Sequence, residues 1–168
     1  EVELMAEIKT VLWPQPGGQN LNAFLDMIAF SEGTDNGRQP TKDRGYDVLV
    51  GGGLFTGYKD HPRVRVSLPR LKLISTAAGR YQLLSRYFDV YKAQLKLPDF
   101  SPLSQDLIAL QLIKECRATD DIRAGKFATA VLKCRSLWAS LPGAGYGQHE
   151  HKIDTLLLAY RKAGGVTA

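Results

Sequence analysis

The chain has 168 residues, of which 44% are hydrophobic and 23% are charged. This length and composition favour one globular domain and exclude wholesale disorder, and no apolar run approaches the roughly 18 residues of a membrane span. Lys and Arg number 22 against 17 Asp and Glu, a net charge of +5. Such a charge indicates an anionic partner (nucleic acid, an acidic membrane face or a cell-wall polymer) or simply aids solubility.

Residues 1–19 form a mixed apolar and acidic segment that ends in the helix-breaking sequence Pro14-Gln15-Pro16-Gly17-Gly18. The segment has neither the basic start nor the unbroken apolar core of a signal peptide. We expect it to be an N-terminal appendage or linker, and we expect residues 20–168 to form a single domain.

A helix is predicted to start at Asn20 or Asn22, since asparagine is a good N-cap. Its apolar residues recur at three- and four-residue spacing, which indicates one buried face: Leu21, Phe24, Leu25, Ile28 and Ala29. The helix should end at Ser31-Glu32-Gly33, because glycine suits a left-handed C-terminal cap.

Residues 33–79 are rich in Gly, Asp and Asn, and they contain only short apolar pieces, at 46–50, 54–55 and 64–66. This pattern predicts a small, irregular antiparallel β lobe, over about residues 40–78, inserted between core helices. A connection this long between helices is usually functional.

After Gly79 the helical period returns, and we expect a helix to begin within 79–84 and to run to about Leu95. Ser101 followed by Pro102 is an N-cap with proline at the first helical position. The helix after it is apolar nearly all round, which predicts a central core helix. Further helices are predicted over 126–138 and from about His149 to Tyr160.

Glu32 is the residue that most suggests chemistry. Glutamates stand only at 1, 3, 7, 32, 115 and 150, so Glu32 is isolated at the junction of a core helix and the β lobe. The helix C-terminus and apolar neighbours both disfavour a charged carboxyl and raise its pKa. A protonated carboxyl at neutral pH is what a general acid requires. On position alone, a solvated last-turn residue is the more frequent case.

Three other residues are weaker candidates for a substrate site. Asp47 opens a predicted strand and could orient Glu32 or a sugar hydroxyl, although capping is the commoner role. Gln82 has an amide suited to sugar hydroxyls, and Tyr146, in the glycine-rich stretch 141–148, could stack on a pyranose ring. A surface position for Gln82 and a flexible connector around Tyr146 are the ordinary alternatives.

Metal and thiol chemistry are not expected. His149 and His151 would point to different faces of a helix, and there is no H-E-x-x-H pattern. Cys116 and Cys134 could meet, but two buried free thiols are the commoner arrangement. We therefore expect no metal and no cofactor.

Five strings of the sequence are long and distinctive: Phe24 to Gln39, which contains Ser31-Glu32-Gly33, then Gly45-Tyr46-Asp47-Val48, Asp60-His61-Pro62-Arg63, Gly79 to Arg86, and Ser136 to Gln148. Together they resemble the bacteriophage lambda endolysin family of peptidoglycan lytic transglycosylases. The resemblance runs from about Asn22 to Gly165. One departure is Gly53, where the string Gly-Gly-x-Leu-Phe has lost a polar or charged side chain, which speaks against a carboxylate contact from the β lobe.

This resemblance implies an α+β lysozyme-like fold, with a mainly helical lobe, a small β lobe and a cleft between them. It implies cleavage of the β-1,4 bond between N-acetylmuramic acid and N-acetylglucosamine, with a 1,6-anhydro product and Glu32 as the catalytic residue. It also carries over Asp47, Tyr81, Gln82 and Tyr146 as substrate contacts. A muramidase acting by hydrolysis and a non-catalytic wall-binding module remain alternatives.

The expected partner is the peptidoglycan glycan strand. We expect no nucleic-acid partner, since Lys and Arg are scattered without a recognition motif, and we expect no stable membrane insertion and a monomeric protein. The resemblance places the protein in the host cytoplasm before lysis and in the periplasm after holin-dependent release.

Overall fold

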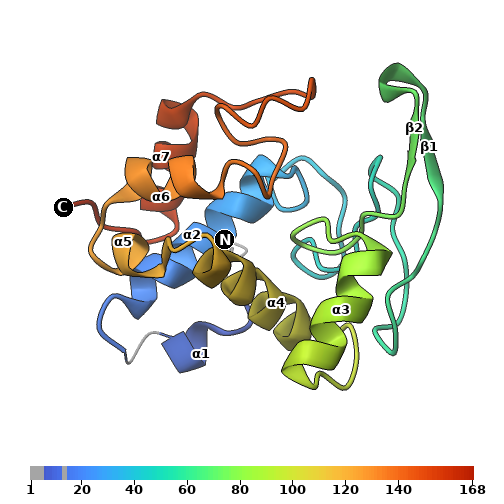
Figure 1. Ribbon diagram of the computed structural model, residues 1–168, viewed down its shortest axis with the longest axis horizontal. Coiled ribbons are helices and arrows are strands. Elements are labelled where there is room, and N and C mark those ends of the chain that lie inside the picture. The colour runs from blue at the N-terminus through green and yellow to red at the C-terminus, as the bar shows by residue number, and fades with distance from the viewer. Residues whose placement is uncertain (1–5, 13–14) are drawn as a thin grey trace.

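The computed structural model describes residues 6–12 and 15–168, which form a helical lobe and a smaller β lobe (Figure 1). The helices and strands, in chain order, are α1 (Lys9–Leu12), α2 (Gly18–Ser31), β1 (Val66–Leu68), the 3-10 turn η1 (Pro69–Leu71), β2 (Leu73–Ser75), α3 (Ser85–Leu95), α4 (Pro102–Glu115), α5 (Thr119–Arg123), α6 (Phe127–Cys134) and α7 (Ile153–Lys162). In Figure 1 the β1–β2 hairpin stands at one side of the molecule, α5 to α7 stand at the other, and α3 lies next to the hairpin.

Helix α2 is the centre of the helical lobe, and it packs against α1, α5 and α7. Its side chains are buried on nearly every face, including the polar Asn22 and Asp26. The prediction of one buried face was therefore too narrow. Helix α4 was expected to be the central helix, but it is less enclosed and leaves Leu103 45% exposed. Its predicted start is confirmed, because Ser101 caps Pro102–Glu115 and its hydroxyl accepts from the Ser104 N–H.

The β lobe is small and irregular, as predicted. Its first part contains isolated bridges that join Val48 to Leu54 and Leu49 to Ala78, in place of the continuous strand expected over 46–50. The regular pairing lies further along the chain, where β1 and β2 run antiparallel with Ser67 opposite Ile74. Dense glycine between the predicted strands explains the short pairing, since glycine adds no side chain to pack and weakens a strand.

The segment predicted to be an appendage contributes to the core over its described residues. Ala6 and Ile8 are each 2% exposed and Leu12 is 5% exposed. The backbone N–H of Ala6 donates to Asp26 Oδ1 at 2.8 Å, and that of Ile8 donates to Asp106 Oδ2 at 2.9 Å. Residues 6–12 are thus attached along the helical lobe. The boundary between an appendage and a domain at residue 19 stays a prediction.

Three predicted helix starts were wrong. Helix α2 begins at Gly18, with Gly17 at its N-cap, so Asn20 and Asn22 lie inside the helix and do not cap it. Residues 79–84 form a turn, in which Gly79 and Gln82 have φ angles of 81° and 54°, and α3 begins only at Ser85. The buried Arg80 requires this turn, because its side chain points into the protein. The last helix begins at Ile153, after the glycine-rich segment, so His149 lies outside it.

None of the helices within 6–12 and 15–168 is long and apolar enough to cross a membrane. Both cysteines are free, as expected, with Cys134 buried and Cys116 half-buried.

Candidate active site

Glu32 is half-buried and stands directly after α2 as its C-cap residue. Gly33 follows with a φ angle of 75°, the left-handed conformation that glycine adopts most easily. The N–H groups of Gly33 and Thr34 donate to the carbonyls of Phe30 and Ala29 at 3.1 and 3.0 Å. The chain therefore leaves the helix immediately after Glu32 and places its carboxyl where the helical lobe meets the β lobe.

The Glu32 carboxyl is bound by a serine from a distant part of the chain. Ser140 Oγ donates to Glu32 Oε1 at 2.8 Å, and Ser31 Oγ donates to Ser140 Oγ at 2.8 Å. Burial raises the pKa of Glu32 to about 7, and the hydrogen bond from Ser140 opposes this rise because it favours the ionised form. The predicted direction of the shift is confirmed. Near neutral pH a large fraction of this carboxyl carries a proton that it can donate.

The segment that carries Ser140 is held by its own polar contacts. The Glu150 carboxylate accepts from the backbone N–H groups of Gly143 and Gly145, at 2.8 and 2.9 Å. The N–H of His151 donates to the Ser140 carbonyl at 2.9 Å. These contacts close residues 140–151 into a compact loop, and they explain how a stretch with three glycines can hold a serine against a carboxyl.

A buried arginine fixes the chain on both sides of Glu32. Arg80 is fully buried, and its guanidinium donates to Asp26 Oδ1 and to Asp35 Oδ2, both at 2.6 Å. Its carbonyl accepts from the Thr34 hydroxyl at 2.6 Å. Burial raises the pKa of Asp26, and the positive charge of Arg80 opposes that rise. Asp26 precedes Glu32 and Asp35 follows it, so the guanidinium ties α2 to the loop that leaves it.

Two of the residues predicted to contact substrate hold loops of the β lobe. Asp47 is 5% exposed, and its carboxylate accepts from Thr41 Oγ1 at 2.5 Å and from the Lys42 N–H at 3.0 Å. Gln82 is half-buried, and its Nε2 donates to the carbonyls of Val48 at 3.2 Å and Gly79 at 3.0 Å. Both oxygens of Asp47 and the amide nitrogen of Gln82 are thus bonded within the protein.

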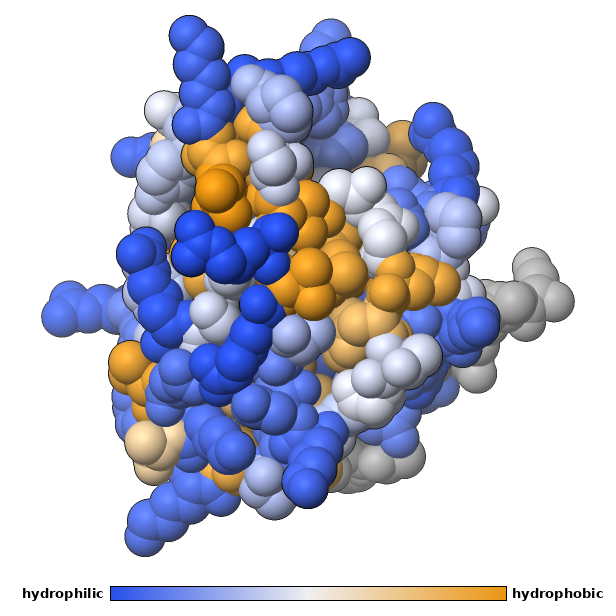
Figure 2. All heavy atoms as spheres, turned by 90° about the vertical axis from the view of Figure 1, so that its right-hand side faces the viewer, coloured by the Kyte–Doolittle hydropathy of each residue, from blue (hydrophilic) through white to orange (hydrophobic). Residues whose placement is uncertain are grey.

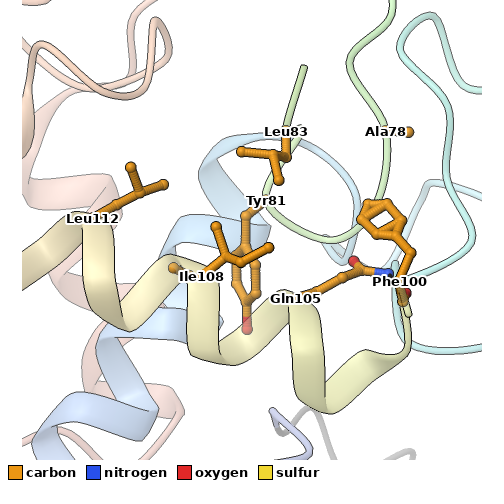
Figure 3. Close-up of a pocket in the computed structure, with 8 residues that line it drawn as sticks. Ala78, Tyr81, Leu83, Phe100, Gln105, Ile108 and Leu112 are labelled. Atoms are coloured by element: carbon orange, nitrogen blue, oxygen red, sulfur yellow. Dashed lines mark hydrogen bonds between the residues drawn. The ribbon is translucent and has the colours of Figure 1, made fainter. Parts of the chain in front are cut away.

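Tyr81, in the turn at 79–84, points into the core against α4 (Figure 3). It is 5% exposed and its hydroxyl donates to Asp106 Oδ1 at 2.5 Å. A substrate contact through this hydroxyl would need an exposed oxygen, which this arrangement does not offer. The Tyr81 carbonyl accepts from Trp138 Nε1 at 3.1 Å, which links this turn to the segment leading to Ser140.

Tyr146, in contrast, is 56% exposed at the glycine-rich loop, and its hydroxyl donates to the Ser136 carbonyl at 2.7 Å. One face of the ring is thus available for stacking while the hydroxyl fixes its position. Tyr146 is the predicted contact residue whose surroundings suit a sugar ring best.

A pocket lies between α4 and the turn at 79–84, and Glu32 is not among its lining residues. Figure 3 shows that its wall is mainly apolar. The lining consists of Ala78, Tyr81, Leu83, Phe100, Gln105, Ile108, Ala109 and Leu112. It is a gap in core packing rather than a site for a hydroxyl-rich sugar.

Within the described part of the chain, no group of three or more His, Cys, Asp or Glu side chains is arranged to hold a metal ion. His149 and His151 lie with their ring centroids 4.8 Å apart, but His151 Nε2 lies 3.1 Å from the Ser31 carbonyl, which engages it.

The model of the Endolysin family matches residues 22–167. The endolysin of Escherichia phage lambda is 62% identical over 144 residues, which cover 85% of this chain and 90% of that protein. The endolysin of Escherichia phage P2 is 54% identical over 159 residues, which cover 89% and 96%. This chain belongs to the endolysin family.

Solved structures also support the membership of this chain in the endolysin family. Phage lambda lysozyme complexed with a chitohexasaccharide superposes with a TM-score of 0.86 and 59% identity, covering 89% of this chain and 96% of that one. A second structure of lambda lysozyme gives a TM-score of 0.83 at 58% identity. The family resemblance and the α+β lysozyme-like fold predicted from sequence are confirmed. The endolysin is a cell-wall-lytic enzyme of the lysozyme type.

The sequence analysis missed Ser140 and Arg80 as parts of the endolysin's site. Ser140 lies in a string quoted for the family resemblance, but no local pattern relates a serine to a carboxyl 108 positions earlier. Arg80 reads as the start of a surface helix. No residue close to Arg80 in the sequence indicates that its side chain is buried and makes ion pairs with two aspartates, Asp26 and Asp35.

Proposed function

We propose that this endolysin is a peptidoglycan lytic transglycosylase that cleaves the β-1,4 bond between N-acetylmuramic acid and N-acetylglucosamine and leaves a 1,6-anhydro sugar. The observation that supports this most is the single carboxyl of Glu32. Burial raises its pKa to about 7, Ser140 is the one side chain that shifts it the other way, and no neighbouring carboxylate among the described residues contributes. One group that carries a proton and later recovers it suffices for this reaction.

The reaction proceeds in two proton transfers at the same carboxyl. Protonated Glu32 donates its proton to the bridging oxygen, and the bond between that oxygen and C1 of the muramic residue breaks. The resulting carboxylate then accepts the proton of the C6 hydroxyl of the same sugar, whose oxygen bonds to C1. The nucleophile belongs to the substrate, so proximity replaces a bound water. The carboxyl ends protonated, ready for another cycle.

Ser140 orients Glu32 during both transfers. Its hydroxyl holds Oε1 at 2.8 Å, which leaves the other carboxyl oxygen to exchange the proton. A hydrogen bond to the ionised form also stabilises the carboxylate that appears between the two steps. The same serine is bonded to Ser31 on α2, so its direction is set from both sides.

The hydrolytic alternative uses a second carboxylate, in a retaining enzyme about 5 Å from the first. Asp47 is the candidate from sequence, and its two oxygens are bonded to Thr41 and Lys42. We therefore favour the transglycosylase and assign Asp47 to holding the β lobe. Tyr146 is proposed as a contact for the glycan strand, because its aromatic ring is 56% exposed and can stack on a sugar.

The products decide between the two reactions. Purified enzyme is incubated with Gram-negative sacculi, and the released muropeptides are analysed by mass spectrometry. Anhydro-muropeptides support the proposal, whereas products heavier by one water, with a reducing end, identify a muramidase. Glu32→Gln should release neither product while it keeps the wild-type circular dichroism spectrum. Binding to sacculi without release by the wild-type protein would indicate a wall-binding module.

We further propose that the protein acts as a monomer, without a nucleic-acid partner and without stable insertion into a membrane. Its place of action is the periplasm, which it reaches from the host cytoplasm by holin-dependent release. The net charge of +5 suits a wall whose peptide stems carry carboxylates.

A further inference from the structure

The two cysteines of the chain lie next to each other in the helical lobe. Cys116 is the C-cap residue of α4, and Cys134 is the last residue of α6. Their thiols are joined by a hydrogen bond, and Cys116 packs against the core cluster that contains Cys134. The chain holds no other cysteine, so each thiol has one possible partner within the molecule.

A second contact holds the same two segments side by side. Lys133, the residue before Cys134, donates from Nζ to the carbonyl of Arg117, the residue after Cys116, at 3.1 Å. The same ammonium forms an ion pair with Asp121 of α5 at 2.5 Å. Helix α5 contacts both α4 and α6. The chain between the two cysteines therefore folds back on itself and returns the end of α6 to the end of α4.

Both positions suit a covalent bond between the sulfurs. A disulfide requires two side chains that face each other across a short distance between their backbones, and hydrogen-bonded thiols face each other. Each cysteine also stands where a helix ends, and helix ends are less firmly held than helix interiors. The final approach of the two sulfurs can thus be taken up at the helix ends, without disturbing the middle of α4 or α6.

The two thiols differ in their access to solvent. Cys134 is fully buried, whereas Cys116 is half-buried. A reagent from outside therefore reaches Cys116 first. Burial raises the pKa of both thiols, so both are protonated at neutral pH, and they react slowly because the thiolate is the nucleophile.

We propose that Cys116 and Cys134 form a disulfide when the folded protein meets a disulfide oxidant, such as oxidised glutathione or a thiol–disulfide oxidoreductase. The Cys116 thiol loses its proton to water and attacks one sulfur of the oxidant, whose S–S bond breaks and releases a thiolate. The Cys134 thiol then loses its proton and attacks Cys116 Sγ, which displaces the second thiolate of the oxidant. Both released thiolates take up a proton, so two protein thiols are oxidised and one disulfide is reduced to two thiols.

This bond stabilises the helical lobe, because a cross-link lowers the entropy of the unfolded chain. It also anchors the segment that follows α6 and carries Ser140 to Glu32. Figure 1 places α5 and α6 at the side of the molecule opposite the β1–β2 hairpin, away from the hairpin face that Figure 2 shows, so the cross-link leaves that face unchanged.

The compartments that the protein passes through set the time of bond formation. The cytoplasm keeps thiols reduced and the periplasm oxidises them, so the disulfide forms after release. This timing rests on the proposed function, whereas the reaction between the two thiols does not.

Oxidised glutathione and the full chain, purified in reductant, test this proposal. After incubation of the folded protein at mildly alkaline pH, we expect a monomer that is lighter by two hydrogens and has no free thiol in denaturant. Trypsin cleaves after Lys and Arg, so the digest should contain residues 115–117 bonded to residues 134–135. The melting temperature of the oxidised protein should exceed that of the reduced protein by about 5–10 °C, and reductant should abolish this gain.

Single-cysteine variants test the order of the two steps. Cys134→Ala should take up one glutathione at Cys116, because the second thiol is absent. Cys116→Ser should stay unmodified, because Cys134 is buried. Neither variant should gain thermal stability on oxidation, and the melting temperature of each in reductant confirms its fold.

Four outcomes overturn the assignment. They are two free thiols that persist in the folded protein and disappear only when it is oxidised in denaturant, a disulfide-linked dimer as the main product, a melting temperature that does not rise on oxidation, and equal uptake of glutathione by the two single-cysteine variants. These readouts need no peptidoglycan, so they are independent of whether the enzyme proves to be a transglycosylase.

Discussion

Replacing Glu32 by glutamine is predicted to stabilise the folded protein, by an amount that grows with pH. Burial raises the pKa of Glu32 from 4.5 to about 7, so the folded state binds this proton more tightly than the unfolded chain does. Well below pH 4.5 the carboxyl is protonated in both the folded and the unfolded state, so it does not lower the free energy of unfolding of the wild type. Its cost in stability grows as the pH rises from there, and it is complete once the folded protein has lost the proton, above pH 7.

The magnitude follows from the two pKa values. At about 1.4 kcal/mol for each unit of pKa, the change from 4.5 to about 7 corresponds to about 3 kcal/mol. The glutamine side chain is neutral at every pH, and its amide oxygen can still accept the hydrogen bond that Ser140 Oγ makes to Glu32 Oε1 at 2.8 Å. The variant should therefore equal the wild type near pH 4 and exceed it by about 3 kcal/mol near pH 9.

The assay is unfolding in guanidinium chloride, followed by circular dichroism at pH 4 and at pH 9. Other buried carboxyls titrate in both proteins, so their effects cancel in the difference. Glu150→Gln is a control of opposite sign: the amides of Gly143 and Gly145 lower the pKa of Glu150, so this variant should lose stability relative to the wild type as the pH rises. A difference for Glu32→Gln that is the same at both pH values would refute the reasoning, because it would show that the carboxyl is not desolvated.

Three further predictions concern residues of the candidate active site. Ser140→Ala removes a hydrogen bond that lowers the pKa of Glu32, so the alkaline midpoint of kcat/KM should move upward by about one pH unit; an unmoved midpoint would count against the contact. Arg80→Met leaves two buried aspartates without their cation, and the free energy of unfolding should fall by about 3–5 kcal/mol in urea titrations, whereas a fall below about 1 kcal/mol would contradict the proposed clamp. Tyr146→Ala should raise KM for a soluble glycan about fivefold to tenfold with kcat retained, since stacking is lost; Tyr146→Phe, which keeps the ring but not its hydrogen bond to Ser136, should raise KM less, and an equal rise in both variants would contradict stacking.

The end of α2 could be predicted from sequence because its signal is local. Apolar spacing marks the helix, and a glycine after Glu32 marks its end, since only the φ angle of 75° that Gly33 adopts allows the chain to turn there. The position of the carboxyl at the end of α2 follows from these two facts. Ser101 before Pro102 is a comparable local signal, and it also predicted the correct helix start.

The turn at 79–84 shows where local signals fail. The apolar period of α3 extends back to Tyr81, so periodicity favoured a helix there. In the folded protein, however, Arg80 makes ion pairs with residues of α2 and the loop after it, and the Tyr81 carbonyl accepts from Trp138. Contacts with partners this distant in sequence outweigh a helical preference worth a fraction of a kcal/mol per residue.

The amino-acid sequence alone was enough to predict the fold class and the family, and to single out Glu32 as the proposed catalytic residue, because long matching strings, helix periods and caps are properties of neighbouring residues. Only the tertiary structure decided which side chains surround that carboxyl. Ser140 reaches Glu32, and Tyr81 turns inward to Asp106, because packing of the lobes brings together groups far apart along the chain. Burial, the cause of the raised pKa, is a property of that packing, and its extent cannot be obtained from any single stretch of residues.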